Sequence, residues 1–343
     1  WLGDGRFPLL AGADARLRQF ESATMYTSEG TVLENANNYA AEEWQVAVYV
    51  QQRARFHPRL SLNLGARLDL QSSIPARVSP RIALVWIAPS EGRLKLVLNS
   101  AFRSPSGYER FAHYSNQIPN PALTSESIKT AELSYEQRLG RHRFLLGAFV
   151  SHFSNLIRLA PVPGLPGPVA VSWYENQGSI INVGGSVTLE GTIGSLSYGA
   201  SFTGAVNQTD QPLVASPGWF GNARVSWDFG AGAPRVSLAS SVSGARYITA
   251  ASATGLDSAG RTVGWDPGTQ MVGPQAELRA SVDSPLGVAG LWLRGVVGAS
   301  LTPFSAYTVG ARQSPEEGFT TPAQMPNSRL FLMLTLGWTL DPP

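Results

Sequence analysis

The sequence predicts an all-β protein: one antiparallel transmembrane β-barrel whose strands are joined alternately by short turns and long loops. Apolar and polar residues alternate with a period of two over segments long enough to cross a bilayer. The 343 residues include 35 glycines and 24 prolines, which fits many strands joined by turns. No run of about eighteen apolar residues occurs, so spanning helices are not expected.

The alternation is clearest in residues 58–70 and 326–340. In the first segment Leu62, Leu64 and Leu68 share one face, while Arg67 and Asp69 occupy the other. A slip of one residue would point such charges outward, and an Arg or Lys at the bilayer midplane costs about 2–4 kcal/mol. The register of these strands is therefore expected to be strongly fixed.

About fourteen strands are predicted, separated by short and long connections in turn. The strands are expected near residues 9–20, 42–56, 58–70, 80–89, 93–103, 127–139, 142–158, 171–192, 195–207, 218–230, 233–248, 272–284, 287–301 and 326–340. The long loops are expected at 21–41, 71–79, 104–126, 159–170, 208–217, 249–271 and 302–325. Outer-membrane barrels combine short periplasmic turns with longer extracellular loops in this way.

Aromatic residues gather at the strand ends that carry the short turns, if the C-terminus is periplasmic. They are Trp86, Phe144, Trp227 and Trp338, and they predict an aromatic girdle. A soluble β-sandwich also alternates apolar and polar positions, but its strands usually run to about five or six residues. Strand length therefore favours the membrane barrel.

Charge and residue usage exclude several function classes. The 26 basic and 24 acidic residues are scattered singly, so nucleic-acid binding is not expected. The absence of cysteine excludes disulfides and thiolate chemistry. The four histidines, His57, His113, His142 and His152, lie in no recognisable nucleophile or metal-ligand spacing. Neither a metal nor another cofactor is expected, and an outer-membrane hydrolase is the disfavoured enzymatic alternative.

The polar face of the strands is expected to line a hydrated or ligand-contacting lumen. Its predicted lumen-facing residues are Arg67, Asp69, Lys95, Asn99, Arg103, Glu132 and Glu136. Alternatively, such charges pair across neighbouring strands and hold the shape of the wall.

The candidate ligand-binding residues lie at the expected extracellular end. They are Arg103, Tyr108, His113 and Tyr114 around loop 104–126, and Arg261 and Trp265 in loop 249–271. Aromatic rings beside Arg or His could hold a chelate or another polar ligand by stacking and charge-assisted hydrogen bonds. The same residues could instead pack the loops together or lie at the membrane interface.

Several short motifs resemble those of TonB-dependent receptors. Residues 102–109, Phe-Arg-Ser-Pro-Ser-Gly-Tyr-Glu, resemble the family's Phe-Arg-Ala-Pro-Ser segment, and 120–126 resemble its Asn-Pro-x-Leu-x-x-Glu element. Residues 131–135 and the run 174–190 are similar to the two strand motifs that follow. The strand ending at Asp69 and the closing strand 326–340 extend the resemblance, in family order, over nearly the whole chain.

The resemblance implies a 22-stranded barrel of a Gram-negative outer membrane, filled by an N-terminal plug that contacts TonB. Because neither plug nor TonB box is found in residues 1–343, we expect a C-terminal barrel region without the plug and first strands. The implied function is uptake of a scarce nutrient such as siderophore-bound iron or cobalamin, with energy supplied through TonB. The implied partners are membrane lipid, a small-molecule ligand and TonB itself. A plugless passive pore or structural barrel is the alternative.

Overall fold

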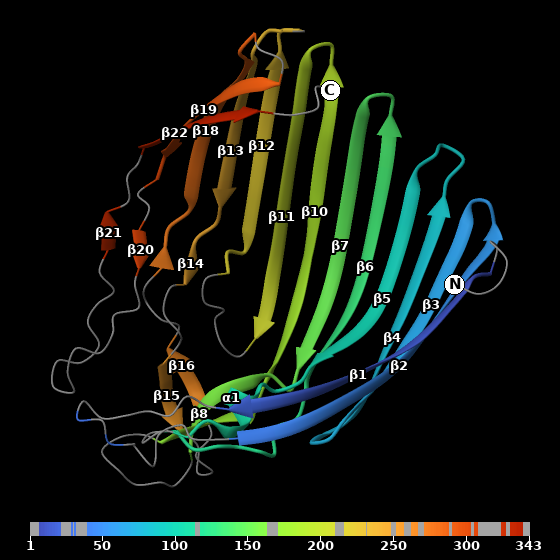
Figure 1. The fold of residues 1–343 in the computed structure, drawn as a ribbon, viewed down its shortest axis with the longest axis vertical. Helices are drawn as coiled ribbons and strands as arrows, with labels where there is room; N and C mark the ends of the chain where they lie inside the picture. The colour runs from blue at the N-terminus through green and yellow to red at the C-terminus, as the bar shows by residue number, and fades with distance from the viewer. Residues whose placement is uncertain are drawn as a thin grey trace.

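A computed structural model shows fourteen antiparallel strands in a single sheet (Figure 1). It describes residues 7–21, 29, 31, 40–113, 117–162, 171–209, 216–230, 232–247, 252–256, 262–266, 271–287, 290–302, 305–307, 324–326 and 330–338. Only the backbone is described for strand residues 247, 252–256, 262–266, 271–272, 305–307, 324–326 and 338. The all-β class and the number of strands predicted from the alternation are confirmed.

The fourteen strands lie side by side in chain order. They are β1 (Leu9–Glu21), β2 (Ala40–His57), β3 (Leu60–Gln71), β4 (Ile74–Ile87), β5 (Arg93–Arg103), β6 (Glu126–Leu139), β7 (His142–Ser154), β10 (Ser179–Ile193), β11 (Leu196–Thr209), β12 (Trp219–Asp228), β13 (Arg235–Ser243), β18 (Gln275–Pro285), β19 (Leu291–Ser300) and β22 (Leu330–Trp338). The sheet curves into an open trough, and among the described residues no pairing joins β1 to β22 (Figure 1).

The sheet has one apolar face and one polar face, because directly paired residues on antiparallel strands point to the same side. One apolar row crosses six strands: Leu64, Ile82, Leu98, Ala131, Val150 and Val183. The apolar face is open, and Leu332 on β22 is 77% exposed. Soluble monomers rarely expose a contiguous apolar surface larger than a few hundred Å², so this face requires a cover.

One predicted loop is wrong. Residues 71–79 were expected to form a long connection, but β4 begins at Ile74, directly after a tight turn at Ser72 and Ser73. Pro75 lies within the expected loop and Pro80 directly after it, and proline removes a hydrogen-bond donor from a ladder. Since β4 pairs with β5 only from Arg81 onward, this part of β4 has a partner on one side and tolerates proline.

Three predicted strands are divided. Residues 233–248 separate into β13 and the short strand β14 (Arg246–Tyr247), and the other two strands bend sharply. Residues 142–158 bend after β7 at Asn155, which has a φ of 54°, and residues 171–192 bend before β10 at Gly178, with a φ of 81°. Both bends need the left-handed conformation that Asn and Gly tolerate best. The detached pieces β8 (Ile157–Pro161) and β9 (Ser172–Asn176) pair with each other as a separate hairpin.

The connections alternate in length as predicted, apart from the β3–β4 turn. The longer ones contain helix α1 (Gly107–Phe111), the β8–β9 hairpin, and the short pairs β14 (Arg246–Tyr247) with β17 (Met271–Val272), β15 (Ser252–Leu256) with β16 (Thr262–Asp266), and β20 (Ser305–Tyr307) with β21 (Gln324–Pro326). In Figure 1, α1, β8, β15 and β16 lie together at the lower end of the trough.

Apart from the β3–β4 turn, the short turns lie at the opposite end of the sheet. Trp86 and Trp227 lie on the apolar face near these turns and are exposed, while the side chain of Trp338 lies outside the described residues. No helix within the described ranges is long and apolar enough to cross a membrane.

Candidate functional site

The site is built around α1, the short helix in the connection between β5 and β6. Ser106 caps its N-terminus: the Ser106 Oγ accepts the Glu109 N–H at 3.2 Å, and the Ser106 N–H donates to the Glu109 carboxylate at 2.7 Å. This reciprocal capping box satisfies amides that a helix start leaves unpaired. The helix ends at Ala112, whose N–H donates to the Tyr108 carbonyl at 3.0 Å.

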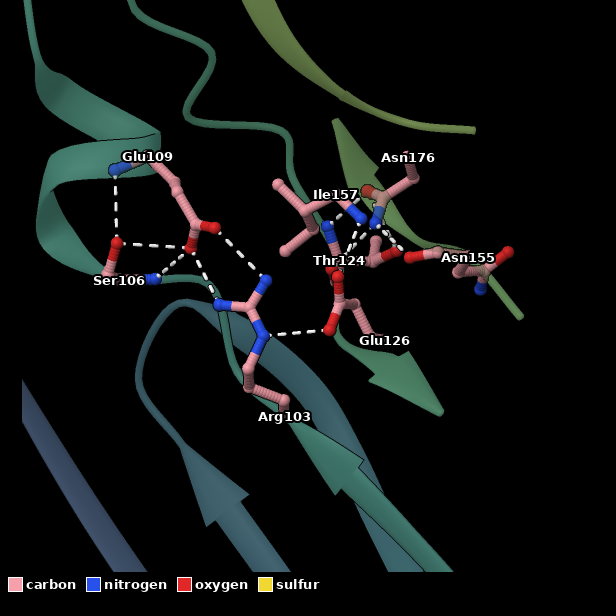
Figure 2. Close-up of polar contacts among 8 residues, drawn as sticks. All are labelled: Arg103, Ser106, Glu109, Thr124, Glu126, Asn155, Ile157 and Asn176. Carbon is pink, nitrogen blue, oxygen red and sulfur yellow. Dashed lines mark hydrogen bonds and ion pairs between the residues drawn. The ribbon is translucent and has the colours of Figure 1, made fainter. Parts of the chain in front are cut away.

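Arg103 joins α1 to the sheet (Figure 2). Its guanidinium contacts both Glu109 oxygens, at 2.9 and 3.0 Å, and donates from Nε to Glu126 at 2.7 Å. Burial raises the pKa of Glu109, but hydrogen bonds from Arg103 and Ser106 outweigh that effect and leave its pKa below the usual range. The Glu109 carboxylate is therefore charged at neutral pH and holds the helix against the end of β5.

A second ion pair attaches α1 to the polar face of β2. Arg110 pairs with Glu43, and both side chains are only 5% exposed. Glu43 also accepts hydrogen bonds from Ser73 at 2.6 Å and Gln71 at 3.0 Å. Breaking such a pair from one side leaves an uncompensated buried charge.

Close packing supports this attachment. Gly107 lies against the Phe20 ring of β1, and a Cβ at that position would come within 2.7 Å of the ring. A larger residue would therefore push α1 away from the wall.

The rest of the connection is tied to the β8–β9 hairpin. The Asn176 side chain accepts the Thr124 N–H at 2.7 Å and donates to the carbonyls of Thr124 at 2.9 Å and Asn155 at 3.0 Å (Figure 2). The Ile157 N–H donates to Glu126 at 2.8 Å. We call α1, residues 117–125 and the β8–β9 hairpin the mouth assembly.

The predicted ligand-binding residues divide into three groups. Arg103 is held by two carboxylates, which fits a positioning role. Tyr108 is 40% exposed and meets the Tyr174 ring edge-on at 6.1 Å, and His113 is exposed just after α1. Tyr114, Arg261 and the side chain of Trp265 lie outside the described residues.

The predicted lumen-facing residues all share the polar face by register. They are Arg67, Asp69, Lys95, Asn99, Arg103, Glu132 and Glu136. Ion pairs join Arg67 to Asp14 at 2.7 Å and to Asp69 at 2.9 Å, and Glu136 contacts Arg138 and Arg143 at 3.1 Å. Within the described part of the chain, Lys95 and Glu132 form no ion pair.

Sequence reasoning missed the residues that hold the mouth assembly in place. The motif from Ser106 to Glu109 has the spacing of a capping box and could have indicated α1. Nothing in the sequence indicates the pair of Glu43 and Arg110, which are 67 residues apart. In the described residues no three His, Asp or Glu side chains gather as a metal site.

The sequence matches a known protein family, and the fold is similar to that of several solved structures. The family model described as "TonB dependent receptor-like, beta-barrel" matches residues 1–283. No curated protein matches the sequence significantly. A solved structure of the ferric enterobactin receptor PfeA from Pseudomonas aeruginosa aligns with a TM-score of 0.75 at 17% identity, covering 96% of this chain and 51% of that one.

Two further solved structures have a similar fold. The copper transporter OprC aligns with a TM-score of 0.72 at 15% identity, covering 98% of this chain and 54% of that one. The siderophore receptor PirA from Acinetobacter baumannii aligns with a TM-score of 0.68 at 16% identity, covering 85% of this chain and 47% of that one. At these identities the likeness establishes the fold alone, and the chain spans about half the length of each structure.

Proposed function

Because the chain belongs to the TonB-dependent receptor β-barrel family, we propose that it forms part of the wall of an outer-membrane receptor for a scarce nutrient. The two-faced sheet carries this proposal. Its apolar face would contact lipid, its polar face would line the lumen, and the long connections would face the outside. The proposed function is transport without catalysis, and the similar solved structures are two receptors, for a siderophore and for ferric enterobactin, and a copper transporter.

A metal chelate is the proposed cargo class. The similar solved structures are receptors for ferric enterobactin and for a siderophore and a transporter of copper, and siderophore-bound iron or cobalamin is the cargo that we propose here. The mouth assembly supports a polar, ring-bearing ligand. Tyr108 offers an exposed aromatic face and His113 an exposed imidazole, while the ion pairs of Arg103 keep α1 in place beneath them. Rings and donors fixed in advance reduce the entropy lost on binding.

Energy would come from TonB through a plug domain that fills the barrel. In this arrangement residues 1–343 are one partial barrel domain of a 22-stranded wall, and the polar face contacts the plug. The wall alone would then bind ligand weakly, because it supplies one side of the binding site.

Growth and uptake assays with the full-length gene test this function. Cells that depend on a ferric siderophore, cobalamin or copper should take up one of these ligands, and uptake should stop when TonB or the plug is deleted. Equal uptake with and without the plug would contradict gated transport and indicate a passive pore. Replacing both Tyr108 and His113 by alanine should weaken ligand binding, whereas Thr188→Ala on the polar face of β10 serves as the matched control.

A further inference from the structure

A single lysine interrupts the apolar face of the fourteen-stranded sheet. By register, Lys129 on β6 lies in the row of Ser100 and His152, on the same side as Leu98 and Val150. Every other Lys or Arg of the described sheet strands points to the polar face. Both Lys129 and His152 are exposed.

The position of Lys129 places it at a membrane boundary. Below it, toward the short turn, the same face of β6 carries Ala131, Leu133, Tyr135, Gln137 and Leu139, and the Tyr135 hydroxyl donates to the Gln137 side chain. At about 3.3 Å per residue and a tilt of about 40°, residues 131–139 cover roughly 20 Å, close to the height of an outer-membrane apolar band. Lys129 lies just beyond this band, three residues from the start of β6 at the long-loop end.

A groove runs from Lys129 and His152 across the apolar face. It is an open, shallow groove of about 680 Å³, and Lys129 and His152 line it together with apolar side chains that include Ile82, Leu98 and Val150. Pro80 and Ser100 also contribute to its lining. The groove is therefore hydrocarbon-lined, with positive charge and an imidazole N–H at the end nearest the long loops.

The pairing of Lys129 with His152 favours an anionic partner. The two residues are directly opposite on β6 and β7, so the lysine ammonium and the imidazole extend from neighbouring points on the same face. A lysine alone could reach the interface by extending its chain, but that does not explain a second basic residue beside it. A phosphate between them would accept a charge-assisted hydrogen bond from the lysine ammonium and a hydrogen bond from an imidazole N–H.

We propose that Lys129 and His152 bind a phosphate of lipid A, with its acyl chains lying in the groove. The long-loop end of the strands selects this lipid, because in the proposed orientation it faces the outer leaflet, where lipid A is the phosphorylated amphiphile. The proposal rests on the outer-membrane placement proposed above. It needs neither ligand uptake nor TonB.

Lipid A binding to the complete receptor tests the proposal. Purified receptor in detergent is titrated with lipid A, dephosphorylated lipid A and phosphatidylglycerol, and bound lipid is measured by native mass spectrometry. Lys129→Gln should weaken lipid A binding about fivefold, the effect of the ~1 kcal/mol that one basic residue contributes near an anionic membrane surface. His152→Gln should weaken it similarly, and Lys129→Arg should retain it.

Lys95 provides the matched control, because it is the only other lysine in the sequence and lies on the polar face. Lys95→Gln should leave lipid A binding unchanged. The proposal would be overturned if the parent and Lys129→Gln bound lipid A equally well, or if Lys95→Gln lost as much lipid A binding as Lys129→Gln. It would also be overturned if Lys129→Arg lost lipid A binding, or if the receptor bound phosphatidylglycerol more tightly than lipid A. Chelate binding by the same samples is measured separately, so that its absence alongside intact lipid A binding contradicts only the proposed function.

Discussion

Replacing Arg110 by methionine tests whether a buried ion pair holds α1 against the wall. The substitution leaves the Glu43 carboxylate 5% exposed, with only the neutral donors Ser73 and Gln71 as partners. Removing one member of a buried pair costs about 3–5 kcal/mol. At about 1.4 kcal/mol per factor of ten, local opening of α1 should rise about a hundredfold to several thousandfold.

Hydrogen exchange measures this opening directly. The amides of Arg110 and Ala112 donate within α1, so peptides covering residues 104–113 should exchange faster, while peptides from β7 should not change. The double variant Glu43→Leu with Arg110→Met removes both charges and should recover much of the protection. Unchanged exchange in the single variant would refute the argument. Equal loss in single and double variants would show that packing, not charge, holds the helix.

Two further predictions concern the sheet and the pH response. Val187→Arg on the apolar face of β10 should lower the free energy of unfolding by about 2–4 kcal/mol, whereas Thr188→Arg on the polar face should change it little. Urea titration of refolding into vesicles measures both free energies, and equal effects of the two substitutions would contradict the assigned faces. The lowered Glu109 pKa contributes stability that is complete above its usual value of 4.5 and is lost as the pH falls through the lowered pKa. Rate-corrected exchange protection of α1 should therefore fall in acid, and Glu109→Gln should abolish that dependence; an unchanged acid response in this variant would rule out Glu109.

The sheet could be predicted from the sequence because its signal is local. Alternation in residues such as Leu60–Leu70 repeats along each strand and fixes which side chains share a face, and the register confirms it. The 71–79 loop was wrong because β4 already pairs with β3 from Ile74 onward. At that point β4 has a partner on one side only, so the strand accommodates Pro80. The breaks at Asn155 and Gly178 depend on single backbone angles, which apolar patterning does not encode.

The mouth assembly could be predicted only in part. The motif around Arg103 lies at the start of the connection that contains α1, and Tyr108 lies on this helix. Its energetics depend instead on Glu43 and Asn176, whose contacts join segments more than fifty residues apart. Such contacts follow from the curvature of the sheet and the path of the hairpin. The alternation of apolar and polar residues along a strand specifies neither.

Spin labels on adjacent residues of β6 test most directly whether the leucine-rich face contacts hydrocarbon. These 343 residues contain no cysteine, so single labels at Glu132→Cys and Leu133→Cys add no competing site within them. With the complete receptor in lipid vesicles, the label at position 133 should be accessible to oxygen and shielded from a water-soluble nickel chelate. The label at position 132 should show the reverse preference. Equal nickel access at both positions would place both faces in water and contradict a membrane-spanning wall.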